Sequence, residues 1–137
     1  MGRNDYLINE LDRKFANYYN YNKEIAIRKE ELKMREADEN IGGGKSNIRS
    51  NPVELQVIKE LSDPYIVNRQ LWKKGIKETL EEQDEEVKVL MELKYWGTDS
   101  WMDWASFGKK HGYSKPTIYR IRQKVLFGFA RKIGEIN

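Results

Sequence analysis

Residues 104–129 most constrain the fold, because their pattern places two helices on either side of one glycine. Four residues recur at the spacing of one helix face: Trp104, Phe107, Gly108 and His111. Gly112 follows at once, and glycine readily adopts the left-handed conformation that ends a helix. Ser114 then stands as a helix cap, and Pro116 is tolerated in a first helical turn. The run therefore predicts a helix, a tight turn and a second, capped helix.

The second predicted helix has an apolar face and a basic, polar face. Its apolar face consists of Ile118, Ile121, Val125 and Phe129. Its outer face and flanks consist of Ser114, Lys115, Pro116, Thr117, Tyr119, Arg120, Gln123 and Lys124. This layout is that of a helix-turn-helix, whose second helix lies in the major groove of double-stranded DNA. The alternative is an ordinary helical hairpin with a solvated basic face.

Charge is segregated along the chain, although the net charge is only +3. Residues 78–100 carry eight acids against two lysines, whereas residues 101–137 carry eight bases against two acids. The excess of basic residues coincides with the predicted helix-turn-helix, as expected for a polyanionic partner.

The chain of 137 residues has room for one domain or two small ones. It has no cysteine, which excludes a disulfide framework and a thiolate metal site. No apolar run approaches transmembrane length and the amino end lacks a signal-peptide core, so we expect a cytoplasmic protein. No segment alternates as strands do, and we therefore expect an all-α fold.

We expect three regions: a helical hairpin at 1–37, a glycine-rich linker at 38–51 and a helical DNA-binding domain at 52–137, with the helix-turn-helix at 101–133. In the hairpin, Leu11 and Phe15 belong to the apolar face of the first helix. Gly44-Lys45-Ser46 in the linker matches the end of a phosphate-binding loop. Glu39 replaces the first glycine of that pattern and no strand precedes it, so nucleotide hydrolysis is disfavoured.

Within 52–137, helices are expected after Pro52, after Asp63-Pro64 and around Asp84. Gly97 should stop the third of these, and Asp103, alone or in a capping box with Ser100, should start the next. Apolar positions expected to face inward are Val53, Val57, Leu61, Tyr65, Trp72, Ile76 and Leu80. The tryptophans are expected in the core: Trp72, Trp96, Trp101 and Trp104.

Residues 84–125 resemble region 4 of bacterial σ⁷⁰-type factors. Leu93-Lys94-Tyr95-Trp96 corresponds to that family's L-R-Y-F-like pattern, and the run from Gly112 to Ile118 corresponds to its G-I-S-x-x-T-V pattern. His111 departs from the family, which usually has an apolar residue at this position. Together with the glycine linker and a tyrosine-rich amino end, the whole chain resembles the RinA/ArpU-type late-gene regulators. The resemblance implies promoter-proximal DNA binding and activation of packaging and structural genes of a phage or phage-derived element.

These patterns assign roles to individual residues. Four residues are expected to read base edges or adjoining phosphates: Lys115, Tyr119, Arg120 and Gln123. Of these, Arg120 suits guanine and Gln123 suits adenine. Ser114, Thr117 and Lys124 are expected to contact phosphate. Arg122 lies nearer the buried face, where a carboxylate partner inside the protein is expected. His111, the only histidine, is expected to pack beside the turn, and we expect no metal or cofactor.

The leading hypothesis is therefore a non-enzymatic, sequence-specific transcriptional activator of late genes. Its amino-terminal helices would mediate homodimerisation or contact RNA polymerase. The alternative is a small terminase subunit that binds packaging-site DNA and assembles into a ring. A nucleotide hydrolase using Lys45 and Ser46 is a third class, against which the absence of predicted strands argues.

Overall fold

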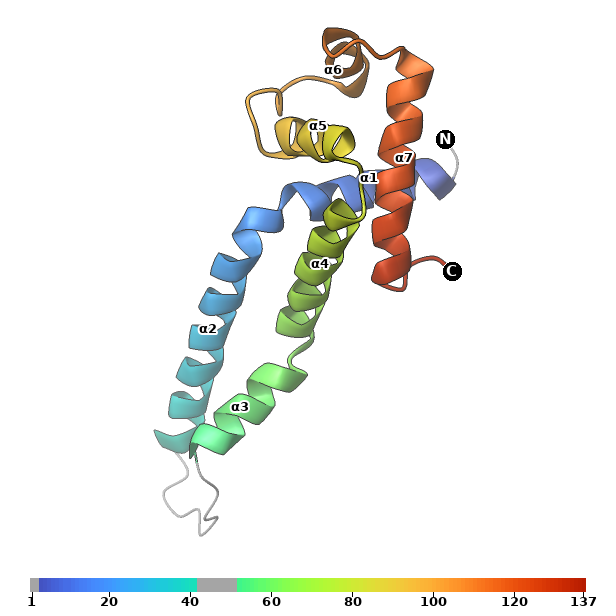
Figure 1. The fold of residues 1–137 in the computed structure, drawn as a ribbon. Coiled ribbons are helices and arrows are strands. Elements are labelled where there is room, and N and C mark those ends of the chain that lie inside the picture. The colour runs from blue at the N-terminus through green and yellow to red at the C-terminus, as the bar shows by residue number, and fades with distance from the viewer. Residues whose placement is uncertain (1–2, 42–51) are drawn as a thin grey trace. The chain divides into compact units, whose positions relative to one another are not determined.

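A computed structural model describes residues 3–41 and 52–137, and within this part of the chain all regular structure is helical. The elements are α1 (Arg3–Ala16), the 3₁₀ turn η1 (Tyr18–Asn20), α2 (Tyr21–Ile41), α3 (Pro52–Ser62), α4 (Pro64–Glu81), α5 (Glu85–Tyr95), α6 (Trp104–Lys110) and α7 (Lys115–Lys132) (Figure 1). The all-α prediction is confirmed. No helix in the described ranges has the length and apolarity required to span a bilayer.

The chain divides into two compact units, and the division differs from the predicted one. Unit 1 comprises residues 1–18 and 72–137, and unit 2 comprises residues 19–71, so the boundary falls within α4. The predicted hairpin at 1–37 is split, because α1 packs against α7 within unit 1 (Figure 1). Asp38 to Ile41, predicted to begin the linker, continue α2 instead. The phosphate-loop-like Gly44-Lys45-Ser46 lies outside the described residues.

The core of unit 1 is formed by one face of each of its helices. Phe15 of α1 is fully buried and lies in an aromatic cluster with Tyr95, Trp96 and Phe129. Further buried side chains of this unit are Ile8, Leu11, Ile76, Leu90, Met91, Trp104, Phe107, Ile118, Val125, Leu126 and Ala130. The fully buried phenylalanines Phe15, Phe107 and Phe129 thus all belong to the unit that contains α7.

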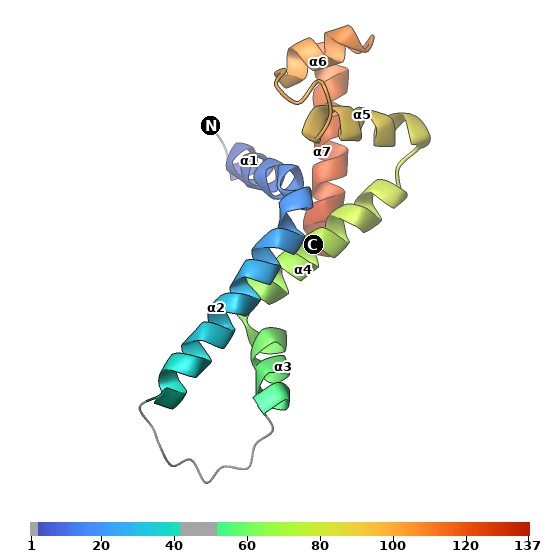
Figure 2. The ribbon, with the colours of Figure 1, turned by 90° about the vertical axis from the view of Figure 1, so that its left-hand side faces the viewer.

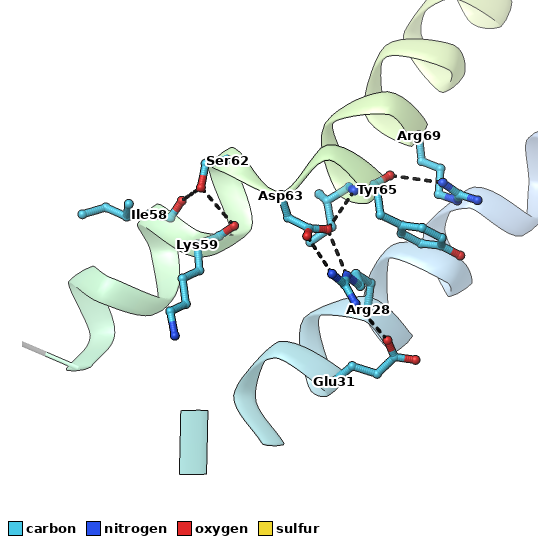
Figure 3. Close-up of polar contacts among 9 residues, drawn as sticks. Arg28, Glu31, Ile58, Lys59, Ser62, Asp63, Tyr65 and Arg69 are labelled. Carbon is cyan, nitrogen blue, oxygen red and sulfur yellow. Dashed lines mark hydrogen bonds and ion pairs between the residues drawn. The ribbon is translucent and has the colours of Figure 1, made fainter. Parts of the chain in front are cut away.

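Unit 2 consists of α2, α3 and the first turns of α4, with α2 and α3 side by side (Figure 2). A bidentate ion pair joins α2 to the α3–α4 junction: Arg28 Nε and Nη2 donate to the two oxygens of Asp63 at 3.0 and 2.9 Å (Figure 3). Asp63 also accepts from the backbone N–H of Ile66 at 3.3 Å. The Arg28 guanidinium holds the pKa of the Asp63 carboxyl below its ordinary value.

The prediction of burial is wrong for five residues. In α3, Val53, Val57 and Leu61 are exposed, and that helix contains no buried residue. Tyr65 is 36% exposed and lies under the guanidinium of Arg69, 3.3 Å from its ring centroid (Figure 3). Trp101, predicted in the core, is 81% exposed because it lies in the turn between α5 and α6, outside any helix face.

Candidate nucleic-acid interface

Helix α6 begins at an aspartate cap. Asp103 has an extended backbone, and its side chain accepts a hydrogen bond from the Ser106 N–H at 2.7 Å. This bond lowers the pKa of the Asp103 carboxyl from its ordinary value. Asp103 is thus itself the cap, which decides between the two alternatives that the sequence leaves open.

A four-residue turn separates α6 from α7 (Figure 1). Gly112 in this turn has a φ of +85°, the left-handed conformation predicted for it. The next amide, that of Tyr113, donates to the Gly108 carbonyl at 2.7 Å, while the Gly112 amide donates to the Lys109 carbonyl at 3.2 Å. The side-chain hydroxyl of Tyr113 also donates to Glu86 of α5. The turn is therefore held both to α6 and to α5.

The two helices cross at Gly108. A Cβ added there would lie 2.6 Å from Cγ2 and 2.8 Å from Cβ of Ile118. Real carbon atoms do not approach so closely, so only glycine allows α7 to lie at this distance from α6. The small residue at 108 is therefore what lets the two helices cross closely.

Helix α7 starts at the predicted serine. Ser114 has an extended backbone; its oxygen accepts from the Thr117 N–H at 3.4 Å, and its hydroxyl donates to Thr117 Oγ1 at 2.9 Å. Pro116 occupies the first turn, where its missing N–H would have no intrahelical acceptor. The cap and the proline define where α7 begins and so fix its register relative to the turn.

The two faces of α7 differ as predicted. The buried residues of the helix are Ile118, Val125, Leu126, Phe129 and Ala130, and Ile121 is half-buried. The exposed residues among the predicted DNA contacts are Ser114, Lys115, Pro116, Arg120, Gln123 and Lys124. The other two, Thr117 and Tyr119, are half-buried. We call these eight residues together, six exposed and two half-buried, the α7 outer face.

Two of the basic residues of α7, Arg122 and Lys132, form ion pairs, whereas Arg131 and the cations of the α7 outer face form none in the described part of the chain. In the described ranges, no ion pair forms at Lys115, Arg120 or Lys124. Arg122 and Lys132, by contrast, pair with Asp12 and Glu82. The positive charge of the outer face is thus not neutralised by an ion pair within the described part of the chain.

Arg122 is fixed by residues that lie far away in the sequence. Its guanidinium pairs with Asp12 of α1 and lies 5.3 Å from the ring centroid of Trp104. Asp12 also accepts a hydrogen bond from the hydroxyl of Tyr95, and burial together with this carboxylate raises the pKa of Tyr95 well above its ordinary value. The expected internal carboxylate partner of Arg122 is confirmed. No local signal identifies Asp12 as that partner, because 110 residues separate the two.

A second anchor joins the two ends of the α6 region. The buried carboxylate of Asp99 accepts a hydrogen bond from Lys110 Nζ at 2.6 Å, and its other oxygen lies 2.8 Å from His111 Nε2. These contacts, that of Lys110 foremost, lower the pKa of Asp99. His111 also packs on the ring of Phe107, with 4.6 Å between centroids, which confirms its predicted packing role. The sequence alone does not distinguish Asp99 from the other acidic residues of 78–100.

Comparison with known proteins places the chain in a family. The model of the family described as "Protein of unknown function (DUF722)" matches residues 7–131, which include parts of both units. No curated protein and no solved structure matches the chain. The chain belongs to the DUF722 family.

Proposed function

We propose that this DUF722 chain is a sequence-specific regulator of transcription that binds double-stranded DNA through the α7 outer face. One observation carries the proposal. Helix α7 begins after a capped turn and buries Ile118, Val125 and Phe129 on one face. Its other face exposes an amide and cations that form no ion pair in the described part of the chain. A helix held by its inner face, with a basic outer face, is what insertion into a major groove requires.

The chemistry of the outer face suits both kinds of DNA contact. The guanidinium of Arg120 and the amide of Gln123 match the acceptor and donor patterns of guanine and adenine. Lys115 and Lys124 are point charges suited to phosphate, and the Ser114 end of α7 offers amides to an anion. The base-reading residues lie within the first three turns of the helix, which is the part of a recognition helix that reaches base edges.

The gene class follows from the resemblance to RinA/ArpU-type regulators. We propose activation of late genes of a phage or phage-derived element. Footprinting on DNA from the chain's own genome tests this directly. Protection next to a late promoter supports the activator, whereas protection at a packaging site alone indicates the small terminase subunit instead.

The role of Arg120 is tested on the footprinted site. Arg120→Ala should weaken binding about 5- to 150-fold and relax the preference at one base pair, because it removes one bidentate contact of about 1–3 kcal/mol. Lys124→Ala should weaken binding equally on matched and mismatched DNA, because a phosphate contact carries no base information.

Arg13→Ala is the matched control, since Arg13 is an arginine of α1 in the same unit with 76% of its side chain exposed. It should leave affinity unchanged. If Arg120→Ala and Arg13→Ala bind every DNA as the wild type does, the α7 outer face is not the DNA-binding surface.

A further inference from the structure

A cavity of about 320 Å³ lies within unit 1, between the α4–α5 turn and α7. Residues 82–84 of the turn line one side of it, and Lys124, Gly128 and Arg131 of α7 line the other. This volume is at the lower end of the range for small-molecule sites and corresponds to that of about ten water molecules. The cavity therefore has the size of a site for a small molecule.

Gly128 lets a molecule in the cavity approach the backbone of α7. A Cβ added at Gly128 meets its nearest neighbour, Thr79 Cγ2, at 3.9 Å, so close packing does not require glycine here. Glycine is nevertheless unfavourable inside a helix. Lys124 lies four residues before Gly128 and Arg131 lies three residues after it, so the three share one face of α7. A molecule that approaches Gly128 is therefore flanked by two cations.

Three charged side chains beside the cavity are available to a bound molecule. In the described part of the chain, Lys124 and Arg131 form no ion pair. Asp84 is the N-cap residue of α5, but its side chain makes no cap hydrogen bond. Glu82, the other acid of the turn, is paired with Lys132 at 2.7 Å. The cavity therefore offers two cations on its α7 side and a carboxylate on its turn side.

We propose that the cavity binds a small phosphate monoester that also carries an amino group. The phosphate lies over Gly128, between Lys124 and Arg131. The amino group donates to the carboxylate of Asp84. The carbon atoms between these two groups pack on the apolar part of the lining, which consists of Val87, Ile121 and Val125. This inference goes beyond the proposed function, and binding of the molecule does not depend on DNA binding.

The charges of the cavity favour this class of molecule over a carboxylic acid or a DNA phosphate. A phosphate monoester carries about two negative charges at neutral pH, which suits a planar guanidinium and a lysine better than the single charge of a carboxylate. The carboxylate of Asp84 accepts but cannot donate, and an ammonium group both donates to it and balances its charge. A DNA backbone phosphate brings no donor, and the acidic turn repels a polyanion.

The first test follows the backbone amide NMR signals of the full-length chain while phosphoethanolamine is added. The amides of residues 82–84 and of Gly128 should shift, with a dissociation constant of about 1 mM or below. Inorganic phosphate should shift the same amides but bind at least about fivefold more weakly, because it lacks the amino group. Ethanolamine, which lacks the phosphate, should leave these signals unchanged at the same concentration.

Variants of the lining residues test the arrangement. Arg131→Ala should weaken binding of phosphoethanolamine at least about tenfold, because one of the two cations is lost. Gly128→Leu should abolish binding, because its side chain occupies the space over the helix, and urea unfolding checks that this variant keeps its fold. Asp84→Asn should remove the preference for phosphoethanolamine over inorganic phosphate, and asparagine is also a favoured N-cap residue. Lys109→Ala is the matched control, since Lys109 of α6 is exposed and forms no ion pair in the described part of unit 1. It should bind phosphoethanolamine as the wild type does.

The contrary outcomes overturn the proposal. Absence of any shift at about 10 mM phosphoethanolamine excludes the site. Shifts confined to residues 114–117 place the phosphate at the amino end of α7 instead. Wild-type binding in Gly128→Leu or Arg131→Ala places the site elsewhere, and an unchanged preference in Asp84→Asn excludes the contact with the amino group.

The cavity site and the proposed function can fail separately. Lys124 belongs both to the cavity and to the α7 outer face. At matched ionic strength, saturating phosphoethanolamine should therefore weaken DNA binding, and this step rests on the proposed function. Shifts at the cavity with unchanged DNA affinity would support the site and contradict the role of Lys124 in DNA binding.

Discussion

Replacing Gly108 by alanine tests whether α6 and α7 cross as tightly as the structure indicates. The methyl carbon would lie 2.6 Å from Ile118 Cγ2, about 1 Å closer than ordinary carbon contacts. Ile118 is fully buried and β-branched, so its side chain has no alternative rotamer to retreat to. Overpacking of this kind costs about 1–3 kcal/mol. Alanine is favoured over glycine in a helix by about 1 kcal/mol, which offsets part of that cost.

Gly128→Ala isolates the steric cost, because Gly128 also lies within a helix but has room. A Cβ added there meets its nearest neighbour, Thr79 Cγ2, at 3.9 Å, which is ordinary contact. Gly128→Ala should therefore stabilise the chain by up to about 1 kcal/mol through helix propensity alone. The two variants should differ by about 1–3 kcal/mol in the free energy of unfolding.

The assay is urea unfolding of both variants and the wild type, followed by circular dichroism and tryptophan fluorescence. Equal denaturant dependence in the three proteins validates the comparison of midpoints. If both variants move the midpoint in the same direction by the same amount, the crossing tolerates a methyl group. The close approach that positions the α7 outer face would then be refuted.

Two further predictions concern the ends of the α6–α7 region. Ser114→Ala should lower the free energy of unfolding by about 1 kcal/mol, because the helix cap is lost. Ser114→Asp should keep the stability and still weaken DNA binding, because its carboxylate would face phosphate. Urea unfolding and gel shifts on both variants check this, and full DNA affinity in Ser114→Asp would contradict it. Because contacts with Lys110 and His111 hold the pKa of Asp99 below its ordinary value of 3.8, the stability they supply is complete above that value and is lost as the pH falls through the lower folded-state pKa. Thermal unfolding from neutral pH to about pH 2 should therefore show a smaller acid loss in Asp99→Asn than in the wild type, and equal losses would exclude this contribution.

The α6–α7 region could be predicted from the sequence because its determinants are local. Asp103, Gly112 and Ser114 each act on residues within a few positions of themselves, through a cap or a left-handed turn. The faces of α7 follow from helical periodicity, which needs no knowledge of the rest of the chain. A surface formed by one helix and the turn before it can thus be predicted from the sequence.

The packing partners could not be predicted, because periodicity shows that a face is apolar without showing what covers it. Leu11 and Phe15 define an apolar face of α1, and the predicted hairpin paired this face with the next helix along the chain. In the structure α1 packs against α7 instead. The same ambiguity explains α3, whose stripe predicts burial but stays exposed.

These distant contacts decide which side of α7 faces outward. Arg122 lies between the buried face and the outer face, and its pairing with Asp12 fixes the rotation of α7 about its axis. Ile118 at the Gly108 crossing fixes the helix one turn before Arg122. With both positions held, Arg120 and Gln123 have no rotational freedom other than that of their own side chains. The proposed specificity therefore depends on Asp12, a residue in α1 that need not touch DNA.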